Sequence, residues 1–145
     1  MDEFLIFGHP NLMVRQSPDG SVVEAQPFFL RTGRYHGDTS AASPSHGEVD
    51  LFLEYRDSVF DRDGRKVSAP TLPGISGTPI WAVMHPSQSI WSPDTGLAVV
   101  AIQSAYTPPG SKHRYLVGKM WTAIMKAFQQ VNREAAREIH ESLFL

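Results

Sequence analysis

The fold class follows most directly from residues 49–56, which read VDLFLEYR. Apolar side chains at Val49, Leu51, Leu53 and Tyr55 alternate with a second, largely polar set. Successive side chains of a β-strand point to opposite faces, so this period of two predicts a strand with one apolar face. A strand of this kind needs neighbours to cover its apolar side, which favours a β-sheet fold.

Short apolar runs rich in β-formers continue on both sides of this strand. We predict strands at Phe4–Phe7, Leu12–Arg15, Ser21–Glu24, Pro27–Arg31, Val59–Phe60, Lys66–Val67, Pro79–Met84 and Leu97–Gln103. Two polar segments, 17–20 and 61–65, contain the Gly that tight turns favour and predict hairpins. Segments 32–48 and 85–96 show no sustained period and predict surface loops.

The last quarter of the chain changes to helical spacing. Apolar residues recur at Val117, Met120, Trp121, Ile124, Met125, Phe128 and Val131, with polar residues on the opposite side. We therefore predict one domain over residues 1–145: a single antiparallel β-barrel of the six-stranded type over 1–114, and a C-terminal amphipathic helix over 115–141. The apolar stripe of the helix should cover one side or end of the sheet.

Composition excludes several classes of partner and cofactor. The net charge is −2 and Lys and Arg do not cluster, so we expect no nucleic-acid partner. There is no cysteine, and the six histidines lack metal-ligand spacing, so we expect no metal site and no cofactor. No apolar run approaches the roughly 18 residues of a membrane span. The chain opens Met1-Asp2-Glu3 without the basic start of a signal peptide, so we expect a cytoplasmic location and no membrane contact.

The segment most informative about chemistry is residues 72–81, LPGISGTPIW, just before a predicted buried strand. It resembles the Gly-x-Ser-Gly-x-Pro signature of trypsin-like serine peptidases. Two further segments resemble that family and occur in the family's order along the chain. Residues 97–104 resemble its strand beside the bound substrate, and residues 7–10 resemble the turn that opens the second barrel of bacterial members. The resemblance implies one half of a chymotrypsin-like fold, namely the second, C-terminal barrel.

The resemblance also implies site residues. Ser76 stands at the nucleophile, and the amides of Gly74 and Ser76 stand where that family binds the oxyanion of the tetrahedral intermediate. Pro70, together with Gln103, Ser104 and Ala105 on the following strand, corresponds to the substrate-binding side. Because acyl transfer needs a hydroxyl on a tight turn beside free amides, the glycines of this segment fit the chemistry as well as the pattern.

Three positions depart from the family pattern. Ile75 stands where members activated by cleavage carry an Asp, so activation of that kind is not expected. Thr78 replaces the second Gly of the signature. Pro70 stands where an acidic residue would select Lys or Arg side chains, so a preference for basic substrates is not expected.

The general base is missing from the pattern. In this family the base His and its orienting Asp come from the first barrel, whereas the chain resembles only the second. Loss of Ser or His from a triad costs on the order of a million-fold in turnover, so we expect the chain alone to be nearly inert. An improvised triad of His36 or His46 with Asp38 or Asp50 is an alternative, if the long loop folds over the site.

Three functions remain open. The chain is a serine peptidase-like domain that acts on a peptide or protein with a separate chain supplying the first barrel, or is a fragment of a longer peptidase. Alternatively it is a non-catalytic barrel that binds an extended peptide or a protein by strand addition around residues 101–105. The third possibility is a structural homodimer that buries the faces a first barrel would cover.

Overall fold

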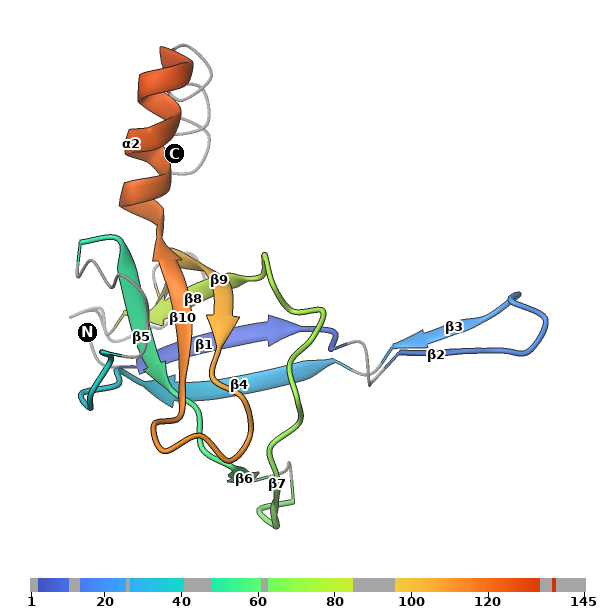
Figure 1. Cartoon of the computed structure of the whole chain (residues 1–145). Coiled ribbons are helices and arrows are strands. Elements are labelled where there is room, and N and C mark those ends of the chain that lie inside the picture. The colour runs from blue at the N-terminus through green and yellow to red at the C-terminus, as the bar shows by residue number, and fades with distance from the viewer. Residues whose placement is uncertain are drawn as a thin grey trace.

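The structure is a computed structural model that describes residues 3–10, 14–25, 27–40, 48–60, 63–84, 96–133 and 137 (Figure 1). Its centre is one antiparallel sheet with the strand order β4-β1-β8-β9-β10-β5. The six strands are β1 (Glu3–Gly8), β4 (Phe28–Gly33), β5 (Asp50–Glu54), β8 (Pro79–Val83), β9 (Leu97–Tyr106) and β10 (Tyr115–Met120).

The sheet curls until its two outer strands meet. Arg34, directly after β4, forms an isolated antiparallel bridge with Leu53 of β5. The amide of Tyr35 donates to the carbonyl of Phe52 at 2.9 Å. Around the barrel the spatial order of four of these strands is β8-β1-β4-β5. Three strands that follow one another in this sheet, β1, β4 and β5, are adjacent, and the next one, β8, returns to lie beside the first, which is a Greek key. The predicted fold class, a mainly β, antiparallel six-stranded barrel with a C-terminal helix, is confirmed.

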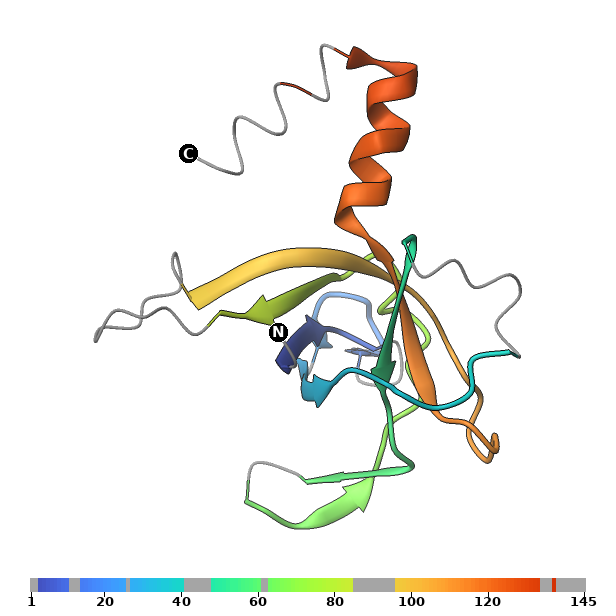
Figure 2. The same cartoon turned by 90° about the vertical axis from the view of Figure 1, so that its left-hand side faces the viewer.

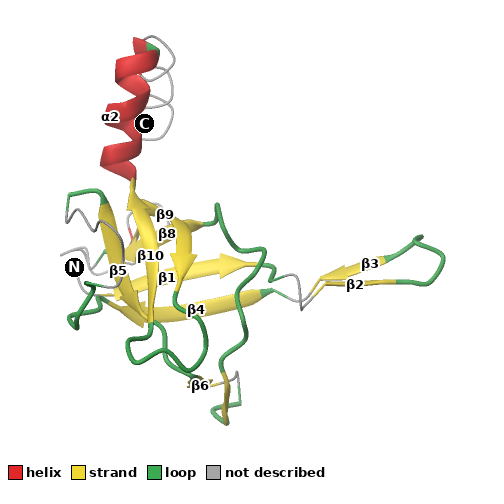
Figure 3. Cartoon of the chain, viewed as in Figure 1, coloured by secondary structure: helices red, strands yellow, loops and turns green. Residues whose placement is uncertain are grey.

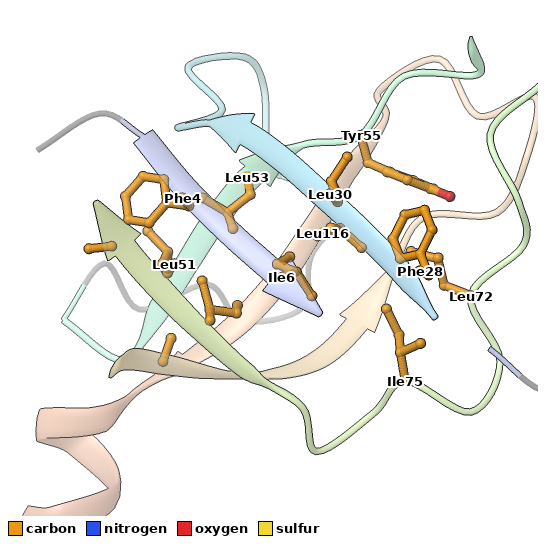
Figure 4. Close-up of a cluster of buried hydrophobic side chains, with 13 residues drawn as sticks. Phe4, Ile6, Phe28, Leu30, Leu51, Leu53, Tyr55, Leu72, Ile75 and Leu116 are labelled. Atoms are coloured by element: carbon orange, nitrogen blue, oxygen red, sulfur yellow. The ribbon is translucent and has the colours of Figure 1, made fainter. Parts of the chain in front are cut away.

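The interior of the barrel is filled by the alternating apolar side chains. Leu51, Leu53 and Tyr55 are each 1% exposed or less, as the period of two predicts. Figure 4 shows Leu51 and Leu53 beside Phe4 of β1, and Tyr55 near Leu30 and Phe28 of β4. Fully burying one side chain of this kind stabilises a fold by about 1.5–3 kcal/mol, so the shared core is the main source of stability.

Two small hairpins lie outside the six-stranded sheet. β2 (Val14–Gln16) pairs with β3 (Val23–Ala25), and β6 (Ser58–Phe60) pairs with β7 (Lys66–Ser68). Gly20 in the first turn and Gly64 in the second adopt φ values of 73° and 76°, which explains the glycine at each place. Both predicted hairpins are confirmed, and Figure 3 shows the β2–β3 hairpin extending away from the barrel.

The C-terminal helix differs from the prediction in its start and its packing. Residues 115–120 form strand β10, and helix α2 covers Trp121–Val131. Val117 and Met120 fit the helical spacing, but the Tyr-Leu-Val run at 115–117 pairs with both β5 and β9, which outweighs helix formation. The helix ends at Val131, with Asn132 as its C-cap, and Arg133 and Arg137 are again helical; of the predicted remainder to 141, residues 134–136 and 138–141 lie outside the described residues.

Helix α2 does not cover the barrel as predicted. Figure 2 shows it standing away from the sheet, and Met125 is its one buried side chain. Phe128 and Val131 are 47% and 88% exposed. None of the helices in the described part of the chain has both the length and the apolar character to cross a bilayer.

The two predicted loops are described only in part. The first runs from 32 to 48 in the prediction, but β4 continues to Gly33, and residues 41–47 lie outside the described ranges. Residues 85–95 of the second also lie outside them. The ends of this second loop are joined by a hydrogen bond of 2.8 Å from the amide of Met84 to the carbonyl of Gly96.

Candidate functional site

Ser76 lies in a pair of tight turns between two glycines with positive φ. Gly74 has φ 97° and Gly77 has φ 92°, conformations that residues with a Cβ rarely adopt. The amide of Ile75 donates to the carbonyl of Leu72 at 3.2 Å, and the amide of Thr78 donates to the carbonyl of Ile75 at 3.0 Å. The Thr78 hydroxyl donates to the same Ile75 carbonyl at 2.8 Å. Threonine in place of the family's second glycine therefore adds a bond within the turn.

Buried side chains on the same segment fix the turn to the barrel. Leu72 and Ile75 are both fully buried in the core (Figure 4). A Cβ on Gly8 would lie 3.0 Å from Thr78 Cγ2 and 3.3 Å from Ile75 Cγ2, so the end of β1 approaches the turn closely. Ile75, which departs from the family pattern, thus acts as an apolar anchor beside Ser76.

Ser76 itself is exposed at the top of this anchored turn. Within the described residues, neither its hydroxyl nor the amides of Gly74 and Ser76 make a hydrogen bond to the protein. A turn that leaves two amides unbonded beside an exposed hydroxyl has donors available for an anion. The arrangement offers one nucleophile-type group and two anion-binding donors.

The four residues of the predicted substrate-binding side lie in different settings. Pro70 is partly buried, and its carbonyl accepts the Tyr55 hydroxyl. Gln103 is 1% exposed, and its backbone is bonded to the turn, so its side chain faces the interior. Ser104 and Ala105 are exposed.

Ser104 occupies an irregularity of strand β9. Gln103 pairs with Gly118 and Ala105 pairs with Val117, so Ser104 is the extra residue of a β-bulge. The last β8–β9 pair is Pro79 with Ile102, so beyond Gln103 strand β9 is paired with β10 alone in the described structure. This short stretch, residues 104–106, lies at a strand edge next to the Ser76 turn, with Ser104 and Ala105 exposed and Tyr106 partly buried.

The described histidines do not form a triad with Ser76. Asp38 lies 4.0 Å from Nε2 of His113, and Asp50 pairs with Lys119 at 2.5 Å, so both acids of the improvised triad have other partners. His36 is exposed, whereas His46, His85 and His140 lie outside the described residues. His9 follows Gly8, which contacts the turn, but its ring packs edge-on against Phe7 at 5.6 Å.

Two of the surface clefts formed by the described residues are large, and neither is lined by Ser76 or Gly74. One, of about 900 Å³, runs along β4 beside the β6–β7 hairpin. The other, of about 670 Å³, lies over β5, β10 and the loop between β9 and β10, and Ser104 and Ala105 reach its wall. The described residues contain no group of three or more His, Asp or Glu that could hold a metal ion.

The sequence analysis did not find the polar cluster at the second cleft. Tyr35 and His113 are far apart in sequence, yet the Tyr35 hydroxyl and His113 Nδ1 lie 3.1 Å apart. The Ser40 amide, bonded to the Asp38 carboxylate, lowers the pKa of Asp38, and His113 and Lys112 add to this effect. Tyr35, Asp38 and His113 belong to no sequence motif, so only the fold brings them together.

Comparison with known proteins finds no match: no family model, no curated protein and no solved structure is significantly similar to this chain.

Proposed function

We propose that this chain is a serine peptidase-like domain carrying the nucleophile and oxyanion half of a trypsin-like active site. The observation that supports this best is the exposed Ser76 hydroxyl on a rigid turn whose own Gly74 and Ser76 amides have no partner in the described structure. In this proposal Ser76 attacks a peptide carbonyl, and the two amides bind the oxyanion that develops. Gln103 acts as a positioning residue, since its backbone holds the turn.

The proposal requires a base from outside the described residues. A serine hydroxyl without an adjacent base is a weak nucleophile at neutral pH. A separate chain that carries a His and an Asp in the manner of a first barrel would supply it. Alone, the domain retains only the rate enhancement that an oxyanion site provides. In subtilisin variants without the triad, the remaining activity is about 10³–10⁴-fold above the uncatalysed rate.

Labelling with a fluorophosphonate tests this function. The Ser76 oxygen would displace fluoride from phosphorus, and imidazole in the buffer would accept the hydroxyl proton. We expect slow labelling of Ser76, located by peptide mass spectrometry, that rises with imidazole and is lost in Ser76→Ala. Ser68, an exposed serine on β7, is the matched control, and Ser68→Ala should leave the labelling unchanged. Labelling of Ser76 no faster than of Ser68 would contradict a nucleophile role.

A second candidate function is a non-catalytic peptide-binding barrel. It is favoured by residues 104–106, which are paired on one side only in the described structure and stand beside the turn. An extended peptide added to this edge should shift the amide resonances of residues 103–106 in a titration, equally in the parent chain and in Ser76→Ala. Shifts confined to other strands would argue against this edge as the binding site.

A further inference from the structure

The cleft over β5 and β10 has the size and form of a small-molecule site. Its volume is about 670 Å³, within the roughly 300–1,000 Å³ of ordinary ligand pockets. It lies on the outer side of the barrel, where Phe52 pairs with Val117 and Asp50 pairs with Lys119 across β5 and β10. The loop 107–113 forms a further wall. The cleft is therefore supported by paired strands on one side and a hairpin loop on another.

Aromatic rings form the apolar part of the cleft. The rings of Phe52 and Tyr115 meet edge to face with centroids 5.4 Å apart, and Tyr35 packs on Tyr115 at 5.1 Å. Tyr115 is 3% exposed, and this burial raises the pKa of its hydroxyl, which stays neutral at ordinary pH. Aromatic rings favour offset or edge-to-face contact with another ring, so a ligand with an aromatic body suits this wall.

The two lysines that line the cleft differ in whether a carboxylate balances their charge. Lys119 is balanced by the buried carboxylate of Asp50 at 2.5 Å. Lys112 also lines the cleft, is exposed, and makes no hydrogen bond or ion pair within the described residues. Asp38 does not line the cleft; it is 58% exposed, accepts the Ser40 amide and lies 4.0 Å from Nε2 of His113. The lining therefore contributes one cation without a direct partner, Lys112.

His113 gives the site a fixed polar edge. Its Nδ1 lies 3.1 Å from the Tyr35 hydroxyl, which orients the ring between the loop 107–113 and the segment after β4. The ring is partly exposed, with 31% of its side-chain surface open, and it lines the cleft next to Lys112. Its Nε2 lies 4.0 Å from the Asp38 carboxylate, beyond hydrogen-bond distance, so a ligand carboxylate drawn to Lys112 would compete with Asp38 for the imidazole.

From these contacts we propose that the cleft binds a small organic carboxylate with an aromatic body. The ring of the ligand lies against Phe52, whose own ring packs edge-on against the buried Tyr115, and its carboxylate faces Lys112 and His113. The proposal is independent of the Ser76 turn, since neither Ser76 nor Gly74 lines this cleft.

Phenylacetate and its uncharged analogue phenylacetamide are the probes for the test. In a titration of the full isotope-labelled chain, phenylacetate should shift the amides of residues 112, 113 and 115 saturably. It should bind about two- to fivefold more tightly than phenylacetamide, the gain expected for one screened charge pair. No saturable shift at these residues, or equal affinity for the two probes, would overturn the proposal.

Three charge variants make the test specific. Lys112→Gln should lower the affinity for phenylacetate to that for phenylacetamide and leave phenylacetamide binding unchanged. Asp38→Asn, which keeps an acceptor for the Ser40 amide but removes the nearby negative charge, should tighten phenylacetate binding. Lys66→Gln is the matched control, because Lys66 is an exposed lysine of the other cleft. Weakening in Lys66→Gln as large as in Lys112→Gln would show a bulk-charge effect and contradict the assigned site.

Discussion

The amide of Gly77 donates a hydrogen bond of 2.8 Å to the carbonyl of Gln103. The amide of Gln103 donates in return to the carbonyl of Thr78 at 2.9 Å. These two bonds join the turn that bears Ser76 to the middle strand β9, so the position of the hydroxyl depends on residues far apart in sequence. These bonds extend the β8–β9 pairing past Pro79 and add to the support that the buried Leu72 and Ile75 side chains give the turn.

Gly77→Ala tests the contribution of the backbone conformation at this joint. A Cβ at Gly77 meets nothing within 4 Å, so the whole effect comes from its φ of 92°. We expect a loss of about 1–2 kcal/mol in the free energy of unfolding, measured with urea. We also expect slower fluorophosphonate labelling of Ser76, because the strain falls on the adjoining peptide.

Gly64→Ala is the matched control for that variant. Gly64 also has a positive φ, 76°, and open space around its Cβ, but it lies in the β6–β7 hairpin. It should lower stability by a similar amount and leave Ser76 labelling unchanged. If Gly64→Ala slowed labelling as much as Gly77→Ala, the loss would reflect general instability and the local role of Gly77 would be refuted.

Gln103 gives a second test, because its buried amide is only half satisfied. Nε2 donates to the Ala105 carbonyl at 3.1 Å, but the buried Oε1 has no partner among the residues that the structure describes. Leucine is similar in size and removes the unpaired oxygen, while the Ala105 carbonyl, on an exposed residue, can turn to water. We expect Gln103→Leu to leave the free energy of unfolding unchanged or raise it by about 1 kcal/mol.

Gln103→Glu is the opposing variant at the same position. It places a carboxylate where the side chain is 1% exposed, and should destabilise the fold by about 3 kcal/mol or more. The measurement is urea unfolding at pH 7 for both variants. A large loss in Gln103→Leu would mean that Oε1 has a partner, such as a bound water, that leucine cannot replace.

The local features of the fold were predictable because they depend on near neighbours in sequence. The alternation of residues 49–56 determines which side chains of β5 face the core, and Leu51 and Leu53 are buried accordingly. The turn at Ser17–Gly20 was predictable for the same reason, since Pro, Asp and Gly have their own backbone preferences.

Features that depend on tertiary pairing were not predictable. Val117 and Met120 continue the apolar spacing of α2, and only the pairing of β10 with β5 and β9 shows that residues 115–120 form a strand. The bridge from Arg34 to Leu53 likewise requires the whole barrel. For the candidate site, the motif placed Ser76 on a turn, but the burial of the Gln103 side chain follows from the register of β9 and was missed.

Tyr55 predicts how stability falls in alkali. Burial raises the pKa of Tyr55 well above its usual value of 10.0, and its hydroxyl donates to the Pro70 carbonyl. The folded state therefore holds this proton more tightly than the unfolded chain. The contribution of the protonated Tyr55 hydroxyl to the free energy of unfolding is fully present below about pH 10. It is lost as pH rises above the pKa that Tyr55 has in the unfolded chain.

Tyr55→Phe should remove part of this alkaline loss. The variant should be less stable at pH 7 by about 1 kcal/mol, because the Pro70 carbonyl loses its donor. Its free energy of unfolding should then fall less steeply than that of the parent chain between pH 10 and 11.5. Tyr115, whose pKa burial also raises, remains in both proteins and accounts for the residual slope. Parallel pH profiles would contradict the assignment to Tyr55.

Asp19 gives the corresponding prediction in acid. The hydroxyl of Ser17 donates to its carboxylate at 2.5 Å, and the hydroxyl and amide of Ser21 donate at 2.8 and 3.1 Å. These bonds, with the Ser17 hydroxyl first, lower the pKa of Asp19 from 3.8 to about 2. The depressed value stabilises the β2–β3 turn above about pH 3.8, and this contribution is lost as pH falls toward 2.

The titration of Asp19, followed by its side-chain carboxyl resonance, measures this directly. Ser17→Ala should raise its pKa toward 3.8 and also loosen the turn, because the Ser17 hydroxyl accepts the Val22 amide at 3.0 Å. Ser21→Ala removes only donors to the carboxylate and should raise the pKa by less, since Ser17 is the larger cause. Ser68→Ala, an exposed serine of the other hairpin, should leave the titration unchanged. An Asp19 pKa near 3.8 in the parent chain would show that the hydroxyls point to solvent and that the turn is held by its backbone bonds alone.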